Sequence, residues 1–125
     1  NFMHILFLIK NSSRNIKLEK KEDKMENKIN KLPNSYQEDI KKATNILKEN
    51  GAKEVFIFGS IANGKFNEHS DIDIAVRGLE PKKFYKVASI LMFELENEFD
   101  LIDLDDIENS FSQMLLKDGG LLKVG

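Results

Sequence analysis

Residues 55–76 read VFIFGSIANGKFNEHSDIDIAV, and this stretch decides the fold. Its first four residues, 55–58, are all apolar, which is typical of a short strand covered on both faces. Gly59 and Ser60 end that run sharply, and a polar connection with turn residues follows. Residues 71–76 begin with alternating polar and apolar side chains, which predicts a second, half-buried strand.

Helical patterns flank these two strands. Ser35 with Glu38 has the spacing of a capping box and predicts the start of a helix that Asn50 and Gly51 would end. Pro81 predicts the start of a second helix, because proline suits the first helical turn. The predicted core-facing positions of the two helices are Tyr36, Ile40, Ala43 and Leu47, and Phe84, Val87, Ala88, Leu91, Met92 and Leu95.

The remaining chain completes a small mixed sheet. Residues 99–104 predict a third strand, residues from 107 onward a last helix that ends near Asp118, and residues 121–124 a short final strand. The order is helix, strand, strand, helix, strand, helix. It predicts a small α/β (α+β) domain with a mixed β-sheet.

Composition limits the chemistry that the chain can carry. The 125 residues contain no Cys and two His, which excludes disulfides, thiolate zinc sites and a cysteine nucleophile, and disfavours a histidine-rich metal site. Carboxylates would therefore bind any metal, and they favour a hard cation such as Mg²⁺.

Charge divides the chain into two parts. Residues 1–32 carry eight Lys/Arg against four Asp/Glu, a net +4, whereas residues 33–125 carry eleven against seventeen, a net −6. We expect 1–32 to be a basic N-terminal extension or leader and 33–125 to be one domain. The acidic body disfavours nucleic acid as a partner. The apolar run 2–9 is too short to span a bilayer, so we expect no membrane partner. We expect a cytoplasmic location.

Three acidic residues carry the predicted chemistry. Asp71 and Asp73 are two apart in a predicted strand, so their side chains share one face and repel each other unless a cation lies between them. A divalent cation does this well. Asp100 lies early in the third predicted strand and joins them if the two strands are neighbours. Asp103 points to the opposite face of that strand and is not expected to take part.

The chain resembles the minimal nucleotidyltransferases of the DNA polymerase β superfamily over about residues 35–124. The resemblance rests on Phe58-Gly59-Ser60, on residues 70–76 and on residues 99–104. It implies a small mixed sheet with helices packed mainly on one face. Many relatives carry arginine where this chain has Ile61 and Asn63.

The resemblance also implies a site. Gly59 and Ser60 would hold the triphosphate of a nucleotide such as ATP, and Lys65 is the candidate to replace the missing arginine charge. Asp71, Asp73 and Asp100 would bind two Mg²⁺ ions. Asp100 would in addition help to deprotonate an acceptor hydroxyl, which attacks the α-phosphorus and releases pyrophosphate.

Among minimal members of the family, the chain resembles the antitoxin half of two-component toxin–antitoxin pairs. The resemblance implies a helical partner, a HEPN toxin, and transfer of AMP to a tyrosine of that toxin. Two alternatives stay open. One is a non-catalytic antitoxin that neutralises its partner by binding alone, and the other is a nucleotidyltransferase that acts on a small molecule. Assembly into a homo-oligomer also stays open.

Overall fold

The computed structural model describes residues 28–125 of the chain. The predicted extension, with its apolar run 2–9, lies almost wholly outside the described residues, so its separate character stays a prediction. Lys28 to Leu32 are described, and they belong to the packed body: Leu32 is buried and Ile29 packs against the same core.

Helices and strands alternate along the chain. In order they are α3 (Asn34–Glu49), β1 (Glu54–Phe58), α4 (Gly59–Asn63), β2 (Ile72–Arg77), α5 (Pro81–Glu94), β3 (Phe99–Asp103), α6 (Ser110–Asp118) and β4 (Leu122–Lys123).

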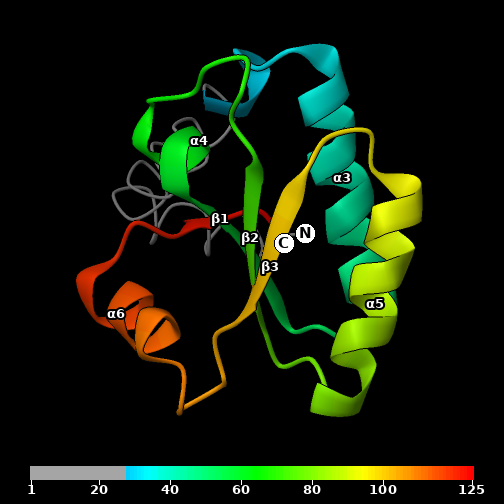
Figure 1. Ribbon diagram of the computed structural model, residues 1–125, viewed down its shortest axis with the longest axis vertical. Helices are drawn as coiled ribbons and strands as arrows, with labels where there is room; N and C mark the ends of the chain where they lie inside the picture. Colours follow the sequence, from blue (N-terminus) through cyan, green and yellow to red (C-terminus); the bar gives the residue numbers. More distant parts are fainter. Residues whose placement is uncertain (1–27) are drawn as a thin grey trace, which may run out of the picture.

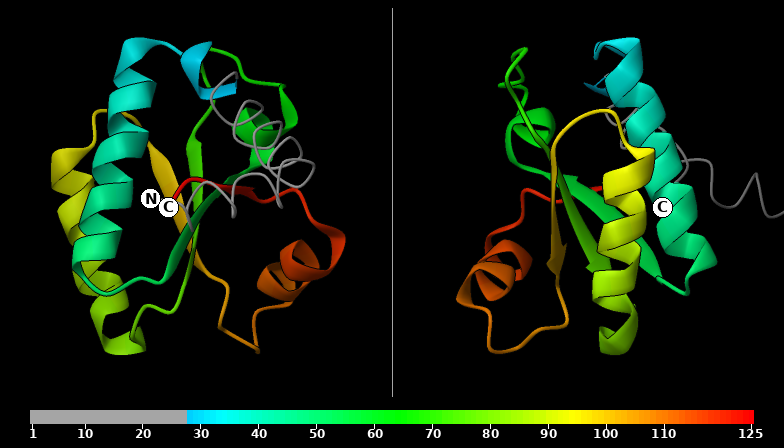
Figure 2. Two further views of the ribbon diagram at one scale, coloured as in Figure 1. Left: turned by 180° about the vertical axis from the view of Figure 1, so that it is seen from behind. Right: turned by 45° about the vertical axis from the view of Figure 1, so that its right-hand side comes forward.

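The four strands form one mixed sheet in the order β3-β2-β1-β4. β1 pairs antiparallel with both β2 and β4, and β2 pairs parallel with β3. Figure 1 shows α3 and α5 side by side against one face of this sheet, and the turned view in Figure 2 shows α6 on the other face. The predicted fold class, a small mixed sheet with helices packed mainly on one face, is confirmed.

The main core lies between the sheet and the two long helices. Ile72, Ile74 and Val76 of β2 point into it and are fully buried, because every second side chain of a strand faces the same side. Val87 and Leu91, one turn apart on α5, close the core from the helix side. A smaller cluster of Phe58, Ala75, Leu104 and Leu115 lies under α6 on the opposite face.

Two local expectations were wrong. Ser35 does not cap α3, which begins at Asn34 with Pro33 as its N-cap and no side-chain cap hydrogen bond. Met92 was expected to face the core, but it is 74% exposed, because the buried stripe of α5 passes through Val87 and Leu91 and Met92 lies one position further round the helix.

Within residues 28–125, no helix is both long enough and apolar enough to cross a lipid bilayer.

Candidate active site

Sheet register brings Asp73 and Asp100 together. Asp73 of β2 is paired with Phe58 of β1 on one side and with Asp100 of β3 on the other. Directly paired residues point their side chains to the same face of a sheet, so both carboxylates lie on the face that carries α6. The opposite face of β2 is fully apolar, and it anchors the strand in the main core.

Asp71 lies just before β2, which begins at Ile72. Its side chain is exposed, as is that of Asp100, whereas Asp73 is half-buried. The charges of both neighbours act on Asp73. The structure therefore gathers the three predicted acids at one end of the β2–β3 pair, with Asp73 as the most enclosed of them.

Asp73 has a raised pKa. The pKa of this carboxyl is raised from 3.8 to about 6, first by burial and then by the nearby charges of Asp100 and Asp71. When protonated, Asp73 also hydrogen-bonds with Asp100, which favours the neutral form further. Within residues 28–125, no Lys, Arg or His lies within ion-pair distance of the three acids. The site therefore carries more negative charge than its own described residues balance.

Gly59 touches the most enclosed acid. It begins α4 with a φ of 70°, a left-handed conformation that L side chains rarely adopt. A Cβ added at Gly59 would collide with the carboxylate oxygen Oδ2 of Asp73 and come within 3.0 Å of its Cγ. The glycine is thus required twice, by its backbone conformation and by the carboxylate packed against it.

The other predicted nucleotide-binding residues follow in and after α4. Ser60 is half-buried, and its carbonyl oxygen accepts a hydrogen bond of 2.9 Å from the Lys65 backbone N–H. This bond folds the chain back beside Ser60 while the Lys65 side chain stays exposed. Ile61 is only 2% exposed and packs in the main core, and Asn63 is exposed. Position 61 therefore serves packing in this chain.

The donor set suits a hard cation that also binds phosphate. Asp71, Asp73 and Asp100 offer only carboxylate oxygens, the ligands that Mg²⁺ prefers. Among the residues from 28 onward, no three acidic or imidazole side chains are arranged closely enough to hold a metal by themselves. Mg²⁺ in nucleotide enzymes is usually bound by one or two carboxylates plus substrate phosphates. The paired acids Asp73 and Asp100 fit that mode.

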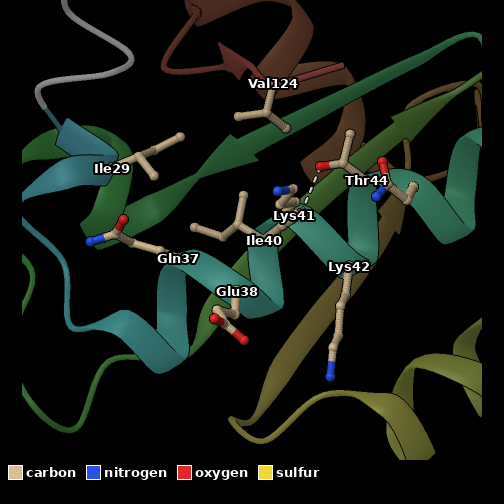
Figure 3. A pocket seen from close by; sticks show the side chains of 9 residues that line it. Ile29, Gln37, Glu38, Ile40, Lys41, Lys42, Thr44 and Val124 are labelled. Atoms are coloured by element: carbon tan, nitrogen blue, oxygen red, sulfur yellow. Dashed lines mark hydrogen bonds between the residues drawn. The ribbon is translucent and has the colours of Figure 1, made fainter.

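One hollow of the surface lies elsewhere. Figure 3 shows side chains from α3, with Ile29 and Val124, around a hollow that contains none of the predicted site residues. Thr44 in its wall uses its hydroxyl to bond the Ile40 carbonyl of its own helix, 2.7 Å away. Charged, polar and apolar side chains line the hollow, and none of them belongs to the acid-bearing strands, so the hollow does not change the assignment of the site.

Sequence reasoning missed Asp39. This carboxylate is 1% exposed and accepts hydrogen bonds from the segment that precedes β3. A signal was present, because Asp39 is an acidic residue three positions after Tyr36 and one before Ile40, on the apolar stripe of its helix.

Known proteins are similar to this chain in both sequence and structure. The family model described as "Polymerase beta, Nucleotidyltransferase" matches residues 41–124. A crystal structure of a toxin-antitoxin with AMP-PNP has a TM-score of 0.53 and 26% identity, and the match covers 66% of this chain and 69% of the other.

A variant of the toxin-antitoxin MntA-HpeT also matches, with a TM-score of 0.53 and 27% identity over 68% of this chain and 70% of the other. No curated protein matches the chain significantly. Since the family model covers more than half of the sequence, the chain belongs to the polymerase beta nucleotidyltransferase family.

Proposed function

We propose that this chain transfers AMP from ATP to a hydroxyl group of a partner protein, a HEPN-type helical toxin, and so acts as the antitoxin of a pair. The observation that carries the proposal is the pairing of Asp73 with Asp100 beside Gly59. Family membership supports nucleotidyl transfer, and the similarity to a toxin-antitoxin with AMP-PNP, an ATP analogue, supports a toxin as the partner and ATP as the nucleotide. A cytoplasmic location stays an expectation.

Each site residue has a proposed role. Gly59 and Ser60, at the start of α4, hold the triphosphate, and the absence of a side chain at Gly59 lets the Asp73 carboxylate pack directly beside this turn. The exposed Lys65 contributes a positive charge to the outer phosphates. These assignments are proposals that rest on position in the fold and on the family motif.

The acidic residues orient the reacting groups. Asp71, Asp73 and Asp100, together with phosphate oxygens of the nucleotide, would hold Mg²⁺, which supplies charge stabilisation to the phosphoryl oxygens when bound. Asp100 is exposed, so an incoming acceptor can reach it, and it takes the proton of the acceptor hydroxyl. The acceptor oxygen then bonds to the α-phosphorus, the bond to the bridging oxygen breaks, and pyrophosphate leaves with the electron pair.

Mass spectrometry of the partner tests the proposal. The protein is co-expressed with the proposed helical toxin partner, and the purified pair is incubated with ATP and Mg²⁺. We expect the partner to gain the mass of one or more AMP units. We expect no gain with Asp71→Ala/Asp73→Ala, and an undiminished gain with Asp105→Ala/Asp106→Ala, which removes the same charge from the other end of β3.

Two outcomes would contradict AMP transfer to a protein. A tight complex without added mass would indicate an antitoxin that acts by contact alone. Neither added mass nor a complex would indicate a small-molecule acceptor, which a panel of hydroxylated compounds with labelled ATP would then identify.

A further inference from the structure

We propose that Tyr36 and Asp39 of α3 are positioning residues that fix the acidic site from the opposite face of the sheet. The inference rests on the proposed function, since it concerns the geometry of the same acids. Neither side chain lies on the site face. Each binds the backbone of a segment that leads directly into one of the acid-bearing strands.

Asp39 holds the segment that leads into β3. Its Oδ1 accepts the Glu96 N–H at 3.0 Å, and its Oδ2 accepts the Asn97 N–H at 2.8 Å and the Asn97 side-chain amide at 2.9 Å. The carboxylate is 1% exposed, so these bonds replace its contact with water. A carboxylate shared by three donors fixes the backbone direction of this segment more firmly than one neutral bond would.

That segment sets the register of the acid pair. Glu98 follows it, and its carbonyl oxygen accepts the Ile72 N–H at 2.9 Å. This bond is the first rung between the two parallel strands, and the pairing of Asp73 with Asp100 comes next along the ladder. A shift of the anchored segment would therefore move Asp100 relative to Asp73.

Tyr36 holds the segment that leads into β2. Its hydroxyl donates to the Ser70 carbonyl oxygen at 2.8 Å, and Ser70 directly precedes Asp71. The Tyr36 ring also packs edge-on against Phe66 of the same connection, with ring centroids 4.9 Å apart. The two residues, three positions apart on α3, thus anchor both acid-bearing segments to one rigid helix.

Removal of the Tyr36 hydroxyl tests the inference cleanly. Tyr36→Phe keeps the ring and its contact with Phe66 and loses only the bond to Ser70. The matched control is Ser112→Ala, since the buried Ser112 hydroxyl donates to the Asp103 carbonyl at 3.0 Å, at the far end of β3. Both variants remove one hydroxyl bond to a backbone carbonyl, so both should lower the melting temperature by a similar small amount.

The two variants should differ at the site. For Tyr36→Phe we expect kcat for AMP transfer to fall about 10-fold, because small displacements of reacting groups are costly, with KM for the partner unchanged. Mn²⁺ affinity in the presence of AMP-PNP, measured by electron paramagnetic resonance on the isolated protein, should fall about 3-fold or more. Ser112→Ala should leave both quantities within about 2-fold of wild type.

Asp39→Asn is the stronger variant. The amide nitrogen that replaces one oxygen would face an N–H donor, so at least one bond to Glu96 or Asn97 is lost. Its control is Asp105→Asn, because the Asp105 carboxylate accepts the Gly78 N–H at 2.6 Å and so joins the other ends of β2 and β3. We expect Asp39→Asn to weaken Mn²⁺ binding by about 10-fold, and Asp105→Asn to leave it unchanged.

Some results would overturn the inference. If Tyr36→Phe lowered the melting temperature as Ser112→Ala does and left kcat and Mn²⁺ affinity at wild-type values, Tyr36 would be a purely structural residue. Asp39 would likewise be purely structural if Asn97→Ala, which removes only the side-chain donor, and Asp39→Asn both bound Mn²⁺ as the wild type does. If the wild type transfers no AMP, the proposed function fails, while the Mn²⁺ measurement still decides the role of the two residues.

Discussion

The two ends of the β2–β3 pair both carry acidic residues, but among the described residues only the acids at one end have cationic and backbone partners. At the end where β2 finishes, Asp105 accepts the Gly78 N–H, and Arg77 lies 3.8 Å from Asp105 and 3.8 Å from Glu54. At the end where β2 begins, Asp71, Asp73 and Asp100 have no such cation among residues 28–125.

The difference separates structural acids from candidate functional ones. An acid paired with a cation and a backbone donor is already balanced and needs no ligand. Asp73 is instead held beside two other acids, with a pKa raised to about 6, and this arrangement costs free energy at neutral pH. Such a cost is typical of functional sites, so the unbalanced charge supports the proposed site at the end where β2 begins.

The largest expected effect comes from replacing Asp73, at the end of the strand pair where β2 begins. Asp73→Asn should lower nucleotidyl transfer by about 10³-fold or more, because the most enclosed ligand for the cation is lost while the side-chain shape is kept. Asp105→Asn at the balanced end should leave the rate within about 2-fold of wild type. Initial rates with labelled ATP measure both, and equal losses in the two variants would refute the distinction between the ends.

Gly59→Ala should have the next largest effect. The methyl group would meet the Asp73 carboxylate and the backbone would be held at a φ of 70°, so we expect a loss of about 2–3 kcal/mol in unfolding free energy. Gly64→Ala is the matched control, since its φ is 73° but nothing lies within 4 Å of the added atom, and about 1 kcal/mol should be lost. Urea unfolding of both variants compares steric conflict with backbone conformation, and equal losses would show that the contact with Asp73 costs nothing.

The pH dependence of stability sharpens the comparison. Because Asp73 has a pKa of about 6 when folded and 3.8 as the ordinary value, the folded chain binds more protons between these values, and stability falls as pH rises through that window. Asp73 should account for about 1 kcal/mol of this fall in unfolding free energy. This is well below the free energy equivalent to the full pKa shift, because its half-exposed side chain is screened by water. Urea titrations in the presence of a chelator, at pH 4.5 and 7 (about the two sides of the window), should show this fall in the wild type and a smaller one in Asp73→Asn. An equal fall in both proteins would contradict the assignment to Asp73.

The smallest effect is expected from Arg77, at the end where β2 finishes and the acids have a cationic partner. Arg77→Gln removes ion pairs whose side chains are 31–48% exposed, and such pairs contribute about 0.2–1 kcal/mol. The loss should shrink in high salt, and transfer activity should be unchanged. A thermal melt at low and high salt measures it, and a large loss that is independent of salt would mean that Arg77 does more than balance surface charge.

The sequence predicted the fold where local patterns and chemistry agree. The apolar run ending at Phe58 and the alternation after Asp71 place two strands without further information. The expectation of a break and a polar connection after Phe58 was wrong in part, because Gly59–Asn63 form the short helix α4. Only the tertiary structure shows that β2 pairs with β3. Asp100 was nevertheless a candidate site residue, because an acid early in an apolar strand requires a partner if it is buried.

The parts that were missed depend on contacts between distant segments. Asp39 lies on the buried stripe of α3, and only the fold reveals that its partners are 57 and 58 residues away in sequence. Met92 has the spacing of a core residue, but the position of α5 over the sheet decides which stripe is covered. Helical periodicity defines a face and leaves the exact edge of that face open.

The mixed pairing of β2 also has a consequence for the order in which the chain folds. β1 and β2 are neighbours in sequence and pair antiparallel, whereas β3 pairs parallel with β2 and requires α5 as a crossover between them. Parallel pairing across a long connection forms slowly, because the entropy of closing the loop is lost before contacts are gained. We therefore expect the contact between Gly59 and Asp73 to form before Asp100 comes to lie beside Asp73. Activity would appear only with the last docking event.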